Sequence, residues 1–173
     1  LSILGAYFHI VAHALMKITL FMCAGAIIVT AHKDNISDMH GIGKKMPITM
    51  ACFTIASLGI SGMPFIIGFL SKWNLALGAL QVGQPLFIAV LIGSALLGLS
   101  YLMPVAYLAF FKPNAKGEFK SYGEANKFML IPICVTAALS VILGIVPNFG
   151  PHLYDLASMA AQSITQGWIG GGW

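Results

Sequence analysis

The chain contains no arginine and little charge of either sign. All nine basic residues are lysines, there are five carboxylates, and charged residues make up 8% of the 173 residues. A soluble domain carries about 25% charged residues. Hydrophobic residues make up 58% of the chain and the mean hydropathy is +0.89. These values indicate a membrane protein, and the net charge of +4 is then a topology signal rather than a nucleic-acid-binding surface.

Cysteine pairs and cofactor motifs are also missing. Cys23, Cys52 and Cys134 lie singly in apolar stretches without C-x-x-C spacing, which is typical of small buried side chains. We find no nucleotide, flavin or iron–sulfur motif, so we expect no cofactor, no catalytic residue and no redox chemistry of the chain's own. The chain begins at Leu1 inside an apolar stretch, which is not typical of a signal peptide. We interpret it as the C-terminal part of a longer protein.

Four apolar stretches are long enough to cross a bilayer: 1–31, 46–80, 86–111 and 127–147. We therefore expect an all-α membrane protein with about four transmembrane helices in one domain over residues 1–147. Residues 148–173 are expected to form a short interfacial tail. This tail is either a frayed end at the membrane surface or a segment that docks on a neighbouring subunit.

The second stretch has an unusual length. As one straight helix it would reach about 52 Å, too long for a hydrocarbon core of about 30 Å, yet a hairpin of two crossings needs more than about 40 residues. Its middle contains Gly59, Gly62 and Pro64, which predict that one half-helix ends near Gly62 and that Pro64 lies in the first turn of the next. We predict a single crossing by a discontinuous helix, with the hairpin as the alternative.

The lysine distribution separates these two topologies. A single crossing places connectors 32–45 and 112–127 on one side with seven lysines and leaves the opposite side with none, whereas a hairpin splits the lysines three against four. The positive-inside rule favours the single crossing. It predicts that both connectors are cytoplasmic and that the C-terminus is external.

Three ionisable residues interrupt the first apolar stretch at helical spacing. His9, His13 and Lys17 lie at i, i+4 and i+8, so they share one helix face over about 12 Å. A charged residue at the bilayer centre costs about 2.5–3.5 kcal/mol on insertion scales, so we interpret the row as a path for protons. A structural ion pair would need a carboxylate, and no apolar stretch contains one. A zinc site or a haem pair is disfavoured because no third ligand follows and haem ligands normally come from facing helices.

Lys72 is the other charge inside an apolar stretch, eight residues after Pro64. A discontinuous membrane helix leaves free backbone groups that hold ions or water within the bilayer. A lysine about two turns from such a break is placed to bind and release protons. The alternative is a lysine that extends to the headgroups beside Trp73.

Two motifs in the chain resemble those of a known family. HIVAHALMKITLFMCAGAI is similar to the H-x-x-x-H-A-x-x-K-x-x-L-F-x-x-x-G signature of the antiporter-like membrane subunits of respiratory complex I, membrane-bound hydrogenases and Mrp cation/proton antiporters. The segment from Gly62 to Lys72 resembles their G-x-P-x-x-x-G-F-x-x-K broken helix. The resemblance places the chain in the second of two inverted five-helix repeats and the closing helices. It implies that His9, His13 and Lys17 belong to a central polar axis and that Lys72 is a gate.

Within this family, the chain most resembles the D-type membrane component of the Mrp antiporters. This implies a proton-translocating subunit of a monovalent cation/proton antiporter in a prokaryotic plasma membrane, with other membrane subunits as partners and H⁺ and Na⁺ or K⁺ as ions. A proton-pumping subunit of a complex I-type NADH:quinone oxidoreductase or of a membrane-bound hydrogenase remains the alternative, and only then would the chain be part of a redox enzyme. The family's first repeat is absent from this sequence, so we do not expect this piece alone to conduct.

Overall fold

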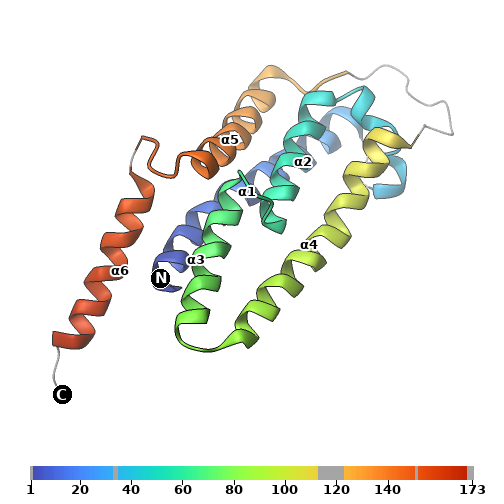
Figure 1. Ribbon diagram of the computed structural model, residues 1–173. Helices are drawn as coiled ribbons and strands as arrows, with labels where there is room; N and C mark the ends of the chain where they lie inside the picture. The colour runs from blue at the N-terminus through green and yellow to red at the C-terminus, as the bar shows by residue number, and fades with distance from the viewer. Residues whose placement is uncertain (1, 33–34, 113–122, 151, 171–173) are drawn as a thin grey trace.

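The computed structural model describes residues 2–32, 35–112, 123–150 and 152–170, the last four by their backbone alone. The described residues form α1 (Ser2–Ala31), η1 (Ile36–Asp38), η2 (Ile42–Lys44), α2 (Pro47–Ser61), α3 (Ile67–Gln81), α4 (Pro85–Phe111), α5 (Lys127–Ile145) and α6 (Leu153–Gly170), where η marks a short 3-10 helix (Figure 1). Helices α1, α4 and α5 are long and apolar enough to cross a membrane, and α2 is a shorter apolar helix. The predicted all-α membrane fold is confirmed.

Helices α2 and α3 lie end to end along the bundle (Figure 1). Together they run alongside α1 and α4, each of which is one continuous helix. At one end, an added Cβ on Gly78 of α3 would overlap Ser2 at the start of α1. Towards the other end, the Cys23 thiol of α1 donates to the Thr49 carbonyl at the start of α2 (3.4 Å). Residues 47–81 therefore make one interrupted crossing, as predicted, and not a hairpin.

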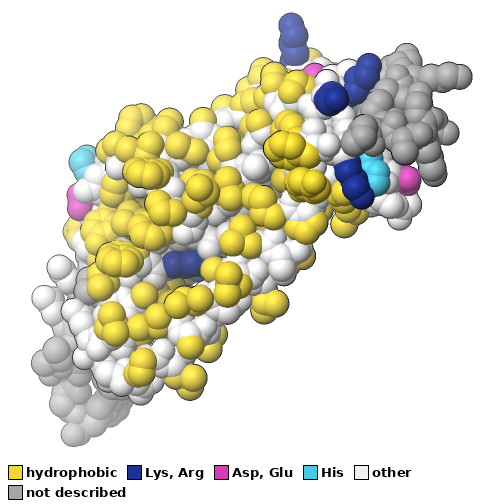
Figure 2. Space-filling view, turned by 45° about the vertical axis from the view of Figure 1, so that its right-hand side comes forward, with side chains coloured by type: hydrophobic (Ala, Val, Ile, Leu, Met, Phe, Trp, Pro, Cys, Tyr) yellow, Lys and Arg dark blue, Asp and Glu magenta, His cyan; other side chains and the backbone are white. Residues whose placement is uncertain are grey.

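The described residues of the two lysine-rich connectors, 35–45 and 123–126, lie at the same end of the bundle. The Gly41 amide donates to the Leu108 carbonyl near the end of α4 (3.0 Å). Glu124 accepts hydrogen bonds from the Ile48 amide (2.9 Å) and the Thr49 hydroxyl (2.5 Å), so its carboxylate caps the N-terminus of α2. Figure 2 shows lysines gathered at this end and one lysine side chain within the broad hydrophobic surface. We call this the lysine-bearing end and the opposite end, which holds segment 82–84, the lysine-free end.

The first half-helix ends at a glycine. Gly62 adopts a left-handed conformation (φ 90°), and its amide donates to the Gly59 carbonyl (3.0 Å). The Met63 amide donates to the Leu58 carbonyl (3.0 Å), which completes a Schellman-type end. The chain therefore leaves α2 with two of its last carbonyls satisfied by the backbone.

The second half-helix begins later than the sequence predicts. Pro64 was expected in its first turn, and this prediction is wrong, because Pro64 lies in the turn between the helices and α3 begins at Ile67. Phe65 has a φ of 70°, in the left-handed region, and a right-handed helix does not continue through such a residue. The break therefore spans residues 62–66.

Close backbone contact holds the two half-helices against each other. An added Cβ on Gly68 would overlap the Gly59 carbonyl, so only glycine fits there. An added Cβ on Gly59 would lie 2.6 Å from the Met16 sulfur and 2.7 Å from Ile66 Cγ2. Met16 precedes Lys17, so this contact places the middle of α1 at the level of the break.

Helix α5 packs against α1, α2 and α3, and α6 packs against α1. The end of α5 reaches the break, where an added Cβ on Gly144 would lie 2.5 Å from the Phe65 carbonyl oxygen. After segment 146–152, α6 packs on α1 through an edge-to-face contact between Phe8 and Tyr154, with ring centroids 5.8 Å apart. The tail thus contains a regular helix, and its position at a membrane surface stays a prediction.

Candidate functional site

Lys72 extends from α3 back to the break. Its Nζ donates to the Ile60 carbonyl in the last turn of α2 (2.7 Å). The last carbonyls of a helix have no partner within the helix, and within lipid each must be satisfied by the protein. The negative end of the helix dipole also favours a cation. Lys72 therefore supplies the hydrogen-bond donor that the Ile60 carbonyl, in the last turn of α2, does not find within its own helix.

A cavity opens beside the Lys72 side chain. Its volume is about 180 Å³, and its walls come from Ser61 and Gly62 at the break, Trp73 on α3 and apolar side chains of α4. Its volume exceeds the roughly 30 Å³ that one water occupies in the liquid. A lysine in the wall of such a cavity is placed to exchange protons with entering water.

His9 joins α1 to the helix that bears Lys72. Its Nδ1 lies 2.8 Å from Ser71 Oγ, and the Ser71 hydroxyl donates its only proton to the Gly68 carbonyl (3.0 Å). This network assigns the shared proton to His9 Nδ1, because the Ser71 oxygen then acts only as acceptor. Neutral His9 keeps the Nε2 lone pair, which is free to accept a proton.

The predicted row continues along α1. The rings of His9 and His13 have centroids 5.5 Å apart, and both residues lie within electrostatic range of Lys72. His13 is also within electrostatic range of Lys17. His9 and Lys17 are partly buried and His13 is exposed. The structure therefore places His9 against Ser71, the neighbour of Lys72, and His13 and Lys17 continue the row along α1.

Neither intramembrane lysine has a carboxylate partner among the described residues. Glu124 caps α2 at the lysine-bearing end, and Asp155 on α6 pairs with the His152 Nδ1 (3.4 Å). Asp38 lies in η1, at the lysine-bearing end. Asp34 and Glu118 fall outside the described residues. An ion pair within this part of the chain therefore does not account for Lys17 or Lys72.

Sequence reasoning missed two polar residues close to Lys72. Ser71 and Asn74 are buried on α3, and each makes a hydrogen bond to another helix. Their position in an otherwise apolar half-helix beside Lys72 was the available signal. The described residues contain no group of three or more His, Cys, Asp or Glu side chains arranged to hold a metal ion.

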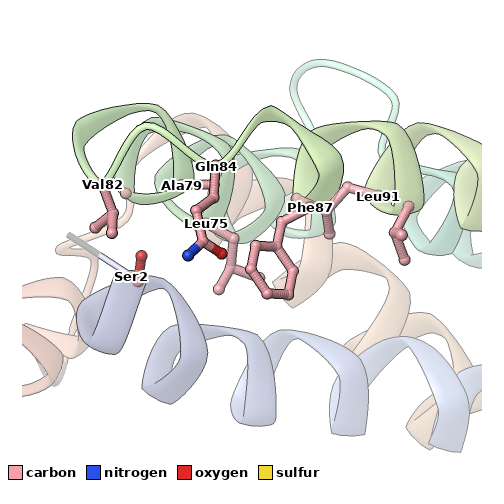
Figure 3. Close-up of a pocket in the computed structure, with 9 residues that line it drawn as sticks. Ser2, Leu75, Ala79, Val82, Gln84, Phe87 and Leu91 are labelled. Carbon is pink, nitrogen blue, oxygen red and sulfur yellow. The ribbon is translucent and has the colours of Figure 1, made fainter.

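A larger cavity lies at the lysine-free end, between the start of α1 and the junction of α3 with α4 (Figure 3). It measures about 390 Å³, and most of its wall is apolar, including Leu75, Val82 and Phe87. Its polar side chains are Ser2 and Gln84, and none of its lining residues is ionisable. This cavity is therefore chemically distinct from the cluster around Lys72.

Residues 1–100 match the family model described as NADH:quinone oxidoreductase/Mrp antiporter, TM. The matched region contains His9, His13, Lys17 and Lys72. The chain belongs to this family. The resemblance to antiporter-like membrane subunits is thereby confirmed, and with it the assignment as an integral membrane protein.

Curated relatives of this chain include respiratory subunits. NADH-quinone oxidoreductase subunit N of Desulforudis audaxviator is 39% identical over 156 residues, which cover 84% of this chain and 31% of the relative. NADH-quinone oxidoreductase subunit L of Escherichia coli K12 is 30% identical over 173 residues, which cover 94% of this chain and 28% of the relative. The chain thus spans less than a third of the length of these two relatives.

Solved structures share the fold of this antiporter-family chain. The Mrp complex of Dietzia sp. DQ12-45-1b contains a chain that matches with a TM-score of 0.79 and 18% identity, over 92% of this chain and 37% of that one. A chain of the archaeal membrane-bound sulfane sulfur reductase matches with a TM-score of 0.73 and 28% identity. This match covers 82% of the present chain and 23% of the reductase chain. The first is described as a complex, and the second as a respiratory membrane complex.

Proposed function

We propose that the chain is part of a proton-translocating membrane subunit of a multi-subunit monovalent cation/proton antiporter. The observation that carries this proposal is the hydrogen bond from Lys72 Nζ to the Ile60 carbonyl across the helix break (2.7 Å). It holds an ammonium group beside a cavity, within electrostatic range of His9 and His13, and without a described carboxylate partner. A titratable group in this setting gains or loses a proton without breaking an ion pair.

Proton transfer follows from the chemistry of these groups. Protonated Lys72 makes a charge-assisted bond to the end of α2, and this bond weakens when the amine becomes neutral. His9 offers its Nε2 lone pair as the next acceptor, and neutral imidazole accepts a proton on one nitrogen while it releases one from the other. His13 and Lys17 extend the row along α1. Gly59, Gly62 and Pro64 belong to the segment that forms and flanks the break.

The proposal includes an orientation and partners. The lysine-bearing end, with connectors 32–45 and 112–127, faces the cytoplasm of a prokaryotic cell, and the C-terminus is external. Other membrane subunits, together with the rest of the longer subunit, cover the exposed face of α1 around His13. The transported ions are H⁺ and Na⁺ or K⁺.

A second candidate is a proton-pumping subunit of a complex I-type NADH:quinone oxidoreductase or of a membrane-bound hydrogenase. The 39% identity to an NADH-quinone oxidoreductase subunit favours it. In that case quinone reduction in other subunits drives the protons, and this chain performs no redox chemistry. Inverted vesicles with the full complex separate the two: Na⁺- or K⁺-driven proton flux supports the antiporter, and flux that requires NADH or H₂ supports the alternative.

Replacement of Lys72 tests the proton pathway in either candidate. In the assembled full-length complex, we expect Lys72→Ala to reduce proton flux by about tenfold or more, in line with the loss of a positioned proton-transfer group. Lys17→Ala should be nearly as harmful, whereas Lys45→Ala, at an exposed connector position, should transport normally. Normal flux in Lys72→Ala would show that the lysine only extends to the membrane surface.

A further inference from the structure

A buried amide continues the polar side chains of α3 towards the lysine-free end. Asn74 is 4% exposed and lies one helical turn after Ser71. Its Nδ2 donates to the Leu70 carbonyl (2.9 Å), and its Oδ1 accepts a hydrogen bond from the Tyr154 hydroxyl of α6 (3.3 Å). Buried polar groups in folded proteins normally have such partners. Here the partner comes from α6, outside the residues that the family model matches.

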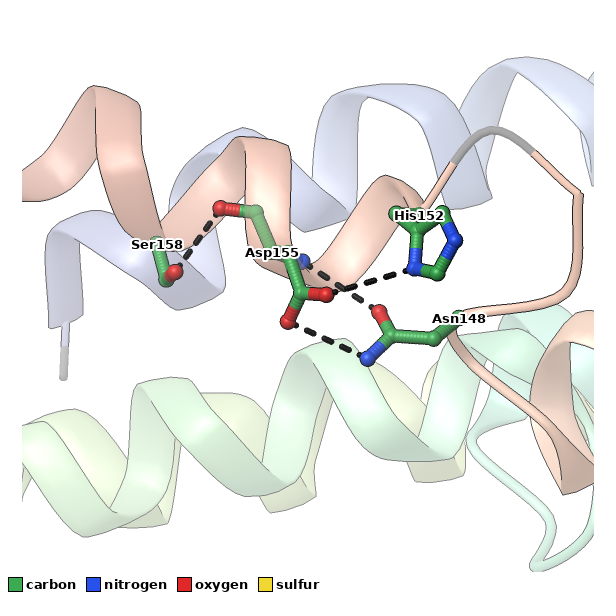
Figure 4. Close-up of polar contacts among 4 residues, drawn as sticks. All are labelled: Asn148, His152, Asp155 and Ser158. Atoms are coloured by element: carbon green, nitrogen blue, oxygen red, sulfur yellow. Dashed lines mark hydrogen bonds and ion pairs between the residues drawn. The ribbon is translucent and has the colours of Figure 1, made fainter.

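Tyr154 connects this buried amide to the molecular surface. Its ring packs edge-to-face on Phe8, next to His9, and the side chain is partly exposed. Three residues near it in the sequence form a surface group, the tail cluster (Asn148, His152 and Asp155), drawn in Figure 4. Asp155 accepts from the Asn148 Nδ2 (3.1 Å) and pairs with the His152 Nδ1 (3.4 Å), and both ionisable side chains are more than half exposed.

We propose that Tyr154 relays protons between His9 and the lysine-free side of the membrane, and that Asn74 positions its hydroxyl. The route runs from His9 through Ser71 and past Asn74 to Tyr154, and it meets water near the tail cluster. This inference rests on the proposed function and names the second half of its pathway. Helix neighbours at i and i+3 have Cβ atoms about 5–6 Å apart, so the proposal includes one water beside Asn74 that takes the proton from Ser71 Oγ and donates it to the Tyr154 oxygen.

The chemistry requires two hydroxyls that turn: Ser71 leaves the Gly68 carbonyl to pass on a proton, and Tyr154 leaves Asn74 Oδ1 to release its own. A phenol both donates and accepts hydrogen bonds, and it rotates about its C–O bond. In each transfer the Tyr154 oxygen accepts a proton from this water and releases its own proton to water near the tail cluster, so the side chain is unchanged afterwards. Asn74 keeps its amide throughout and serves only to aim the hydroxyl inward.

Tyr154→Phe in the assembled full-length complex tests the relay, because it keeps the ring on Phe8 and removes only the hydroxyl. We expect proton flux to fall about fivefold. This loss is smaller than the rate loss that usually follows removal of a positioned proton-transfer group. Tyr101→Phe, on an α4 tyrosine that is 56% exposed, is the matched control and should transport normally. Tyr154→His should restore flux, because imidazole relays protons, whereas a purely structural role would not be rescued.

The Lys72→Ala variant in the same series separates this inference from the proposed function. If Lys72→Ala loses flux while Tyr154→Phe transports normally, the exit route is wrong and the proposed function stands. If Tyr154→Phe and Tyr154→His both lose flux, Tyr154 has only a structural role and the relay is again refuted. If Lys72→Ala transports normally, the proposed function itself fails.

Discussion

The α2–α3 break and the α5–α6 segment both contain a glycine in the left-handed conformation, yet their surroundings differ. At the first, Gly62 has a φ of 90°, and an added Cβ would lie 3.1 Å from Lys72 Cδ. At the second, Gly150 has a φ of 69°, and an added Cβ would meet nothing within 4 Å. The same backbone conformation therefore produces a candidate site only where a functional side chain packs against it.

The two interruptions also differ in how their charges are satisfied. Lys72 donates to a backbone carbonyl at a partly buried position, whereas His152 and Asp155 face each other at an exposed one. An exposed pair is well solvated and contributes little to stability. A lysine held by a carbonyl has no opposite charge to fix its own charge state, so the first break is the one suited to proton exchange.

The largest effect is expected where the half-helices touch. Gly68→Ala would drive a Cβ into the Gly59 carbonyl, and we expect a loss of stability of about 3 kcal/mol, since backbone atoms cannot move aside as a side chain does. Gly93→Ala on α4 is the matched control, because an added Cβ there meets nothing within 4 Å. Thermal unfolding of the purified complex measures both. Equal melting temperatures for the two variants would contradict the tight packing at the break.

A smaller effect is expected at the two left-handed glycines, and it should separate them. Alanine at either Gly62 or Gly150 costs about 1–2 kcal/mol of backbone strain. Only Gly62→Ala should also reduce proton flux several-fold, because its Cβ crowds Lys72 Cδ and weakens the hydrogen bond from Lys72 to the Ile60 carbonyl. Flux and thermal stability measured on both variants check this. A similar loss of flux in Gly150→Ala would remove the distinction between the two interruptions.

The smallest effect is expected for the exposed pair on α6. Asp155→Asn removes one charge from a solvated position and should cost less than about 1 kcal/mol, less still at high salt. Proton flux should change little, because water near the tail cluster accepts protons without the carboxylate. A large loss of flux would mean that Asp155, and not water, is the terminal acceptor.

Parts of this fold that depend on local sequence were predictable. The ends of α1 and α4 follow from the ends of two long apolar stretches, and the break follows from the length of residues 46–80 and its central glycines. The position of Pro64 was missed because the left-handed Phe65 reflects packing rather than local preference. The start of α3 therefore could not be inferred from proline alone.

The candidate site divides in the same way. Helical spacing alone places His9, His13 and Lys17 on one face, since all three lie on a single helix. The contact between Tyr154 and Asn74 joins residues 80 positions apart, and no periodicity relates them. Long-range polar contacts of this kind depend on how α6 packs against α1 and contacts α3. That packing cannot be predicted from composition or helical spacing.

The central claim is that a proton-exchanging group stands at the α2–α3 break, and comparison of Lys72→Gln with Lys72→Glu tests it most directly. Glutamine keeps a hydrogen-bond donor, on a side chain one bond shorter than lysine, that does not titrate, whereas glutamate titrates. We predict that Lys72→Gln reduces proton flux in the assembled complex as severely as Lys72→Ala, and that Lys72→Glu retains a measurable part of it. Wild-type flux in Lys72→Gln would contradict the account, because a hydrogen bond across the break would then suffice.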